Sequence, residues 1–105
     1  MPSIPSLTPD RLSQRETEYL RFTECASTSK TRVWSVESRR HGSVLGIISW
    51  YGAWRQYTFR PHSGTIFNSG CLADIQAFLD DAMADWREKL AAERKRRRES
   101  EAVGG

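Results

Sequence analysis

The two cysteines and two histidines of this sequence, Cys25, Cys71, His41 and His62, are of types that ligate metal ions or act as nucleophiles and bases. Structural zinc sites usually draw such ligands from pairs separated by about two to five residues. No C-x-x-C or H-x-x-x-H pair occurs here, and the isolated histidines and cysteines indicate no catalytic triad. The sequence also lacks a phosphate-binding loop of the G-x-x-x-x-G-K or G-x-G-x-x-G type. We therefore expect no metal, no cofactor and no enzymatic activity.

A different chemistry is indicated by aromatic, polar and cationic side chains at Tyr51, Trp54, Gln56 and Arg60. Aromatic rings on a sheet stack unpaired nucleic-acid bases, at roughly 1–3 kcal/mol per base, and arginine adds its charge. The same residue types are enriched at the hot spots of protein interfaces. A third interpretation is structural: the N-terminal segment folds over this face and buries Trp54. The sequence leaves these three alternatives open.

Further arginines are candidates for contacts with nucleic-acid phosphates or with another partner. They are Arg39, Arg40, Arg94, Arg96 and Arg97. The first two lie in a predicted turn at residues 39–42, which could carry function or be an ordinary polar connection. The other three belong to a basic run at 94–98. That run could neutralise phosphates, or it could be a solvated helix end whose cations favour the negative end of the helix dipole.

The elements that would position these side chains are strands in the middle of the chain. Residues 31–38, 43–51 and 54–60 are rich in β-branched and aromatic side chains, and a turn separates the first two strands. Gly52-Ala53 suits a two-residue type II′ hairpin turn between the second and third strands. Pro61 ends the third strand, and residues 66–67 could add a short fourth one.

The two-residue turn sets a register in which Tyr51 lies opposite Trp54 and Ile48 lies opposite Tyr57. Because alternate residues of a strand share a face, one face then carries the better core. That face holds Ile48, Trp50, Arg55, Tyr57 and Phe59. The other face is mixed, as a partly exposed binding surface would be. It holds Leu45, Ile47, Tyr51, Trp54, Gln56, Thr58 and Arg60.

A long amphipathic helix is predicted to follow, at about residues 71–96. Its apolar side chains recur at spacings of three and four residues. They are Leu72, Ile75, Phe78, Leu79, Ala82, Met83, Trp86 and Leu90. The segment Asn68-Ser69-Gly70 offers an N-terminal cap. We expect residues 94–105 to form a basic, frayed tail.

Residues 1–29 are predicted to form an N-terminal arm. Thr8-Pro9-Asp10 has the residue types of a helix start, and a short helix over about residues 9–23 would place several apolar side chains on one face. Residues 25–30 are predicted to be a linker. The expected fold is therefore α+β. A three-stranded antiparallel β-meander, or a four-stranded one, packs against one long C-terminal helix and forms a domain at 30–93.

Length, cysteine content and charge bound the class of protein. The 105 residues suit a single domain, no apolar run approaches the roughly 20 residues that span a bilayer, and the N-terminus lacks signal-peptide features. Two distant cysteines favour free thiols in a reducing cytoplasm, with a single disulfide as the alternative. Residues 30–62 hold six cations against one carboxylate, whereas residues 72–93 hold six carboxylates against two cations. A basic sheet and an acidic helix are the main hint about partners.

The string WYGAWRQYTF at 50–59, followed by TIF at 65–67 and CLADI at 71–75, resembles a pattern of short phage and bacterial proteins. The resemblance spans roughly residues 30–86. It implies a mobile-element or accessory setting, carries no activity and assigns no site. The order of three strands and a helix is also similar to that of the arm-type DNA-binding domains of phage integrases, which is an analogy of element order alone.

Two classes of function follow from these observations. In the first, the protein is a small binding module that contacts nucleic acid or a nucleoprotein through the basic, aromatic-bearing sheet face. In the second, it is a phage-type accessory protein that binds and inhibits a host protein complex. We slightly favour the first because it needs fewer assumptions.

Overall fold

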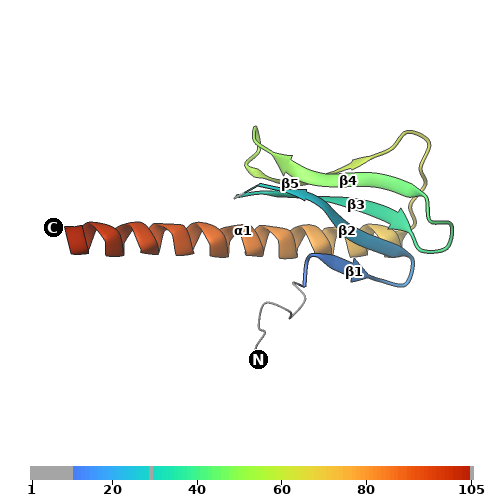
Figure 1. The fold of residues 1–105 in the computed structure, drawn as a ribbon. Coiled ribbons are helices and arrows are strands. Elements are labelled where there is room, and N and C mark those ends of the chain that lie inside the picture. Colours follow the sequence, from blue (N-terminus) through green and yellow to red (C-terminus); the bar gives the residue numbers. More distant parts are fainter. Residues whose placement is uncertain (1–10, 29, 105) are drawn as a thin grey trace, which may run out of the picture.

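In the computed structural model, which describes residues 11–28 and 30–104, five strands form one antiparallel sheet and a single helix follows them (Figure 1). The strands are β1 (Gln14–Glu16), β2 (Leu20–Ser27), β3 (Arg32–Ser38), β4 (Val44–Tyr51) and β5 (Gln56–Pro61), and the helix is α1 (Ser69–Gly104). Each strand pairs with the next one along the chain. The α+β class and the antiparallel meander are thus as predicted, but the sheet has five strands in place of three or four.

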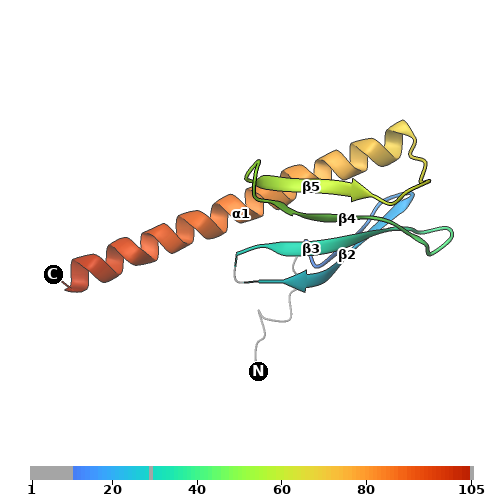
Figure 2. The same ribbon diagram turned by 90° about the horizontal axis from the view of Figure 1, so that it is seen from above.

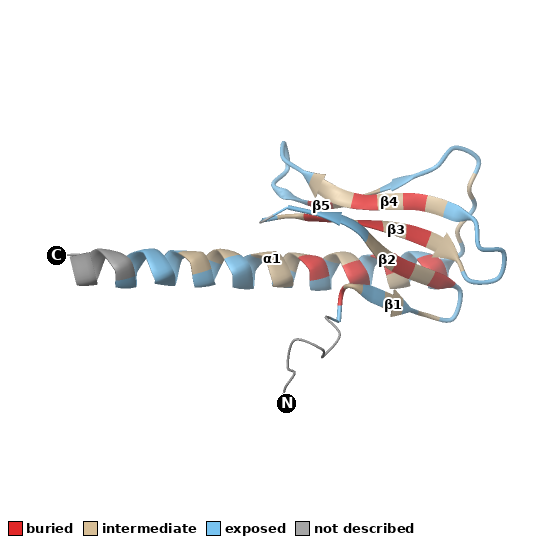
Figure 3. Cartoon of the chain, in the orientation of Figure 1, coloured by how far each residue is buried: buried red, intermediate tan, exposed pale blue. Residues whose placement is uncertain are grey.

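The helix crosses one face of the sheet, and the hydrophobic core lies between the two layers. Figure 2 shows α1 running obliquely across the strands, and Figure 3 shows the buried residues on the facing surfaces. Phe78 of the helix stacks on Phe22 with ring centroids 4.4 Å apart and meets Trp34 edge-on at 4.9 Å. The buried apolar residues are Leu12, Leu20, Phe22, Trp34, Val36, Ile48, Tyr57, Cys71, Ile75, Phe78 and Ala82.

The facing layers also carry opposite charges. Arg32 is only 4% exposed and donates two hydrogen bonds to the Glu24 carboxylate, at 3.1 and 2.8 Å. Its guanidinium also lies 3.5 Å from the Asp85 carboxylate of the helix. Arg15 of β1 forms an ion pair with Asp81 at 2.7 Å. Part of the charge difference between basic sheet and acidic helix is therefore neutralised inside the protein.

The predicted helix at residues 9–23 is wrong, because the described part of that segment forms strands β1 and β2. Leu20 and Phe22 are buried while Tyr19 is exposed, which is the alternation of a strand and not of a helix. A turn joins the two strands, with the Thr17 N–H donating to the Leu20 carbonyl at 2.9 Å. Leu12 is bound to the core through the Trp34 indole, which donates to its carbonyl. The segment predicted to be an arm thus contributes two strands, and residues 1–10, including the predicted helix start, lie outside the described residues.

The β4–β5 connection is longer than predicted. Tyr51 pairs with Gln56, and Ile48 with Phe59, so the loop comprises residues 52–55 and not Gly52-Ala53 alone. Arg55 occupies the left-handed region at φ 54° within this loop, so its predicted place on the core face is also wrong. The register error is two residues. An even slip leaves the paired side chains of β4 and β5 on their predicted faces. Leu45, next to an irregularity in the β3–β4 pairing, was predicted on the mixed face but packs against the core.

The segment between β5 and α1 contains no strand, so the optional fourth strand at residues 66–67 is not formed. Phe67 packs its ring edge-on against Phe59 at 5.4 Å, while the Ile66 side chain is 90% exposed. The predicted cap is confirmed, since the Asn68 side chain accepts the Cys71 N–H at 2.8 Å. The helix continues to Gly104, beyond the predicted end at about 96, and thus includes the basic run that was expected to be frayed.

Candidate functional site

Four of the predicted site residues form a group that we call the β4–β5 cluster: Tyr51, Trp54, Gln56 and Arg60. The first three lie at the β4–β5 loop, whereas Arg60 lies near the other end of β5 and extends its side chain toward Tyr51. The Tyr51 and Trp54 rings meet at right angles with centroids 5.0 Å apart. The Arg60 guanidinium lies 5.9 Å from the centroid of the Tyr51 ring. Gln56 is exposed and pairs directly with Tyr51 across the two strands.

The rings of this cluster are open to solvent. The Trp54 side chain is 65% exposed and the Tyr51 side chain is 36% exposed, although both are large and apolar. Two backbone hydrogen bonds hold the loop, from the Trp54 N–H to the Tyr51 carbonyl and from the Arg55 N–H to the Gly52 carbonyl, both at 3.2 Å. No described residue covers the rings, so burial of Trp54 by the described part of the N-terminal segment is excluded.

The sheet face that carries this cluster points away from the helix and is mixed in charge. Arg21 donates to the Glu16 carboxylate at 2.7 Å, and this hydrogen bond holds the Glu16 pKa below its ordinary value. Arg60 forms no ion pair with a described residue. Among the described residues of this face, Arg60 therefore offers an uncompensated positive charge next to an exposed ring.

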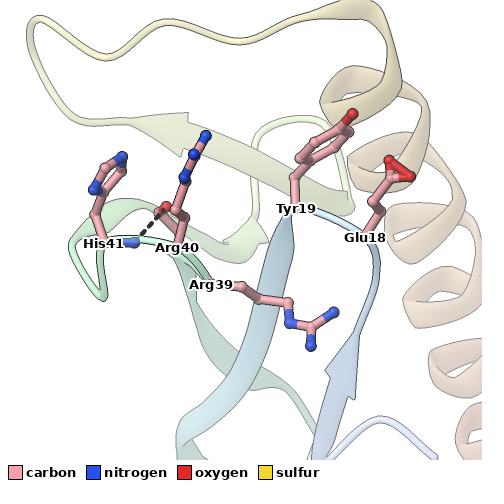
Figure 4. A pocket seen from close by; sticks show the side chains of 6 residues that line it. Glu18, Tyr19, Arg39, Arg40 and His41 are labelled. Atoms are coloured by element: carbon pink, nitrogen blue, oxygen red, sulfur yellow. Dashed lines mark hydrogen bonds between the residues drawn. The ribbon is translucent and has the colours of Figure 1, made fainter.

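Arg39 and Arg40 lie at the opposite end of the sheet, because β4 runs its full length between them and Tyr51. With Ser38 and His41 they line a pocket of about 520 Å³ whose other wall is Glu18 and Tyr19 (Figure 4). Arg39 donates from its side chain to the Thr17 carbonyl at 2.6 Å, so it holds the pocket together. Arg40 has no hydrogen bond or ion pair with a described side chain.

Arg94, Arg96 and Arg97 lie on the part of α1 that extends beyond the sheet (Figure 1). Figure 2 shows this extension leaving the sheet at the end where the β4–β5 loop lies. Arg97 forms an ion pair with Glu93 at 3.3 Å. Arg94 and Arg96 are exposed and have no ion-pair partner among the described residues. The nine predicted site residues thus form three separate groups.

Sequence reasoning missed Glu18, Tyr19 and Ser38 as lining residues of the pocket. The first two were assigned to a helix, and their proximity to the 39–42 turn depends on the pairing of Leu20 with Ser38 across β2 and β3. The only local pattern that could have indicated the pocket is a turn between two strands. The sequence of residues 17–19 does not clearly indicate such a turn.

The residues with metal-binding potential do not converge. Cys25 is exposed on β2 and Cys71 is buried in α1, and both are free thiols. Residues 11–28 and 30–104 contain no group of three or more histidine, cysteine or acidic side chains placed to hold a metal ion. No helix within the described ranges is both long and apolar enough to cross a membrane.

A phage protein is similar to this chain. The chain is 32% identical over 73 residues to the "Uncharacterized 9.3 kDa protein" of Acholeplasma phage L2, and the alignment covers 68% of this chain and 92% of the phage protein. No protein-family model and no solved structure matches. The alignment includes nearly all of the phage protein, so the predicted likeness to phage proteins is confirmed at the level of the family. The chain belongs to the family of this phage protein.

Proposed function

We propose that this protein is a non-enzymatic binding module that recognises unpaired nucleic acid, alone or in a nucleoprotein, through the β4–β5 cluster. The observation that carries the proposal is the exposure of two contacting aromatic rings beside an arginine without an ion-pair partner. The two exposed rings adjoin each other and have polar Gln56 and Arg60 beside them, an arrangement typical of interaction sites. The proposal includes no catalytic step.

Stacking supplies the short-range attraction in this account. The Trp54 ring stands perpendicular to Tyr51, so one ring can stack on a base while the other supports it from the edge. Each stacked base contributes roughly 1–3 kcal/mol. The loop hydrogen bonds fix the Trp54 backbone before a ligand arrives, which reduces the entropy lost on binding.

Charge supplies the long-range attraction. Arg60 lies beside the rings, and Arg94 and Arg96 project on α1 from the same end of the sheet. Arg97 contributes less, because Glu93 already neutralises it. Three phosphate contacts on a single strand would give a plot of log affinity against log salt with a slope of about −2.

The test is fluorescence anisotropy of a labelled single-stranded oligonucleotide, titrated with the full chain at several salt concentrations. We expect binding that weakens with salt at the slope stated above. Arg60→Ala should reduce both the affinity and the slope, whereas Arg97→Ala should change the slope less. A complete lack of binding at low salt, where electrostatic attraction is strongest, would rule out this function.

A host protein is the second candidate partner, and the family membership favours it. Tryptophan, tyrosine and arginine are also the residues enriched at protein-interface hot spots, and the sheet face carries acidic Glu16 as well as arginines. In this alternative the protein is a phage-type accessory factor that inhibits a host complex through the same cluster. It predicts a stable complex with a host protein that Trp54→Ala abolishes, together with negligible affinity for bare oligonucleotides.

A further inference from the structure

The pocket at the far end of the sheet has the size of a small-ligand site. It occupies about 520 Å³ between the β1–β2 connection, which supplies Glu18 and Tyr19, and the β3–β4 turn, which supplies Ser38 to His41. Ligand pockets commonly measure about 300–1,000 Å³. One base with its sugar and phosphate fits this range, whereas a folded partner does not.

The two walls of this pocket are fixed to each other by hydrogen bonds. The Arg39 N–H donates to the Tyr19 carbonyl at 3.0 Å, and the Arg39 guanidinium donates to the Thr17 carbonyl at 2.6 Å. Within the turn, the His41 N–H donates to the Ser38 hydroxyl at 3.2 Å, the dashed line of Figure 4. The pocket is therefore formed before any ligand binds, and a ligand would not have to order two loops.

The groups presented to the pocket suit a base and a phosphate. The Tyr19 side chain is 47% exposed, and Figure 4 shows its ring, the Arg40 guanidinium and the His41 imidazole projecting to the same side of the strands. A ring and a guanidinium plane are the two surfaces on which proteins stack unpaired bases. Arg40 and His41 also carry N–H donors that can bind phosphate oxygens.

Glu18 adds a preference among bases. Glu18 lines the pocket beside Tyr19, and the interaction with its carboxylate raises the Tyr19 pKa. A carboxylate has further acceptor positions but no donor at neutral pH. It can accept an exocyclic amino group, as carboxylates do from cytosine, but it repels a carbonyl oxygen at the same place. Adenine, cytosine and guanine present such an amino group on the Watson–Crick edge, whereas uracil presents there one N3–H donor between two carbonyl oxygens.

We propose that this pocket binds one nucleotide with an amino-bearing base, stacked against Tyr19 and Arg40, with its phosphate on Arg40 and His41. This inference rests on the proposed function, because it supplies a second contact for the same strand. The β4–β5 loop lies at the other end of β4 from this pocket. Since β4 has eight residues and a strand rises about 3.3 Å per residue, the two ends are about 26 Å apart.

The test titrates the full chain with adenosine monophosphate, uridine monophosphate and inorganic phosphate, and follows the NMR signals of Tyr19 and His41. We expect adenosine monophosphate to shift both signals, uridine monophosphate to bind more weakly, and inorganic phosphate to move His41 alone. Arg40→Ala should lower the affinity for adenosine monophosphate about tenfold, which is the effect of losing one charge-assisted hydrogen bond. Arg55→Ala, which removes an exposed arginine from the β4–β5 loop, is the control and should leave this binding unchanged.

The outcomes separate this inference from the proposed function. If adenosine monophosphate leaves the Tyr19 and His41 signals unmoved, or binds Arg40→Ala as well as the unaltered chain, the nucleotide pocket is refuted. Equal binding of the adenine and uracil nucleotides would refute the role given to Glu18. An oligonucleotide that binds normally but does not respond to Arg40→Ala would overturn the pocket and leave the β4–β5 cluster intact. If Trp54→Ala abolishes oligonucleotide binding but leaves adenosine monophosphate binding at the pocket, both the proposed function of the β4–β5 cluster and the nucleotide pocket are supported.

Discussion

Gly46 of β4 provides a sharp test of the sheet's packing, because β5 leaves no room there for a side chain. A Cβ atom at this position would lie 2.6 Å from the Arg60 carbonyl oxygen and 2.6 Å from an edge carbon of the Phe59 ring. The carbonyl belongs to the backbone of the paired strand and cannot turn aside. Gly46→Ala must therefore separate β4 from β5 at this point, and the Phe59 ring must also shift, which disturbs its contact with Phe67.

The expected cost follows from this overpacking. Inserting a methyl group into a filled site lowers the free energy of unfolding by about 1–3 kcal/mol. Replacing glycine by alanine also reduces the conformational entropy of the unfolded chain, which raises the free energy of unfolding by about 0.4–1 kcal/mol. The net destabilisation is therefore between about 0 and 2.6 kcal/mol, with a middle value of about 1.3 kcal/mol. Gly52→Ala, in the adjoining loop, is the matched control, because a Cβ there meets no atom within 4 Å and the residue has no positive φ. This variant should be neutral or slightly stabilising.

Thermal unfolding followed by circular dichroism measures the difference. For a domain of this size each kcal/mol shifts the Tm by about 4–8 °C. We therefore expect Gly46→Ala to melt at least about 5 °C below Gly52→Ala, with an unchanged far-ultraviolet spectrum at low temperature. If the two variants melt together, the close approach of β5 to Gly46 is not present in the protein and the described packing of this hairpin is incorrect.

Three further predictions concern stability. Asn68→Ala removes the acceptor of the Cys71 N–H and should cost about 1 kcal/mol in urea unfolding, and an unchanged midpoint would show that the cap contributes nothing. Glu24→Ala removes one carboxylate that neutralises the buried Arg32 and should lower the free energy of unfolding in urea by about 3 kcal/mol or more. A loss below about 1 kcal/mol would contradict the buried ion pair. Burial raises the Tyr57 pKa above 10.0, so the folded state holds this proton more tightly than the unfolded state. Stability should therefore fall as the pH rises through about 10 and above, and Tyr57→Phe should lessen that fall in unfolding curves at about pH 9 and pH 11.

The parts of the fold that sequence reasoning predicted well are those set by a strong local period. The apolar side chains of α1 repeat every three or four residues, and Ile75, Phe78 and Ala82 are buried as this pattern predicts. The faces of the paired residues of β4 and β5 were assigned correctly even though the loop was predicted two residues too short, but Leu45 was placed on the wrong face. Side chains alternate with a period of two, so an even error in register does not exchange the faces.

The parts that failed depend on distant contacts. β1 has only three residues, and its pairing with β2 cannot be inferred from so short a pattern. Apolar residues of β2 that seemed compatible with a helix are buried because β3 and α1 lie beside them. The same holds for the candidate site: Tyr51, Trp54, Gln56 and Arg60 share one hairpin and were grouped correctly, whereas the pocket around Tyr19 joins two connections that only the folded sheet brings together.

The central claim is that the exposed rings of the β4–β5 cluster bind unpaired nucleic acid. The most direct measurement compares single-stranded oligonucleotide binding by Trp54→Ala with binding by Ile66→Ala, a loss of another exposed apolar side chain outside the cluster. We expect a loss of about 1–3 kcal/mol in binding free energy for Trp54→Ala, or roughly fivefold to 150-fold in Kd, and no change for Ile66→Ala. Equal affinity of the two variants for the oligonucleotide would contradict the central claim.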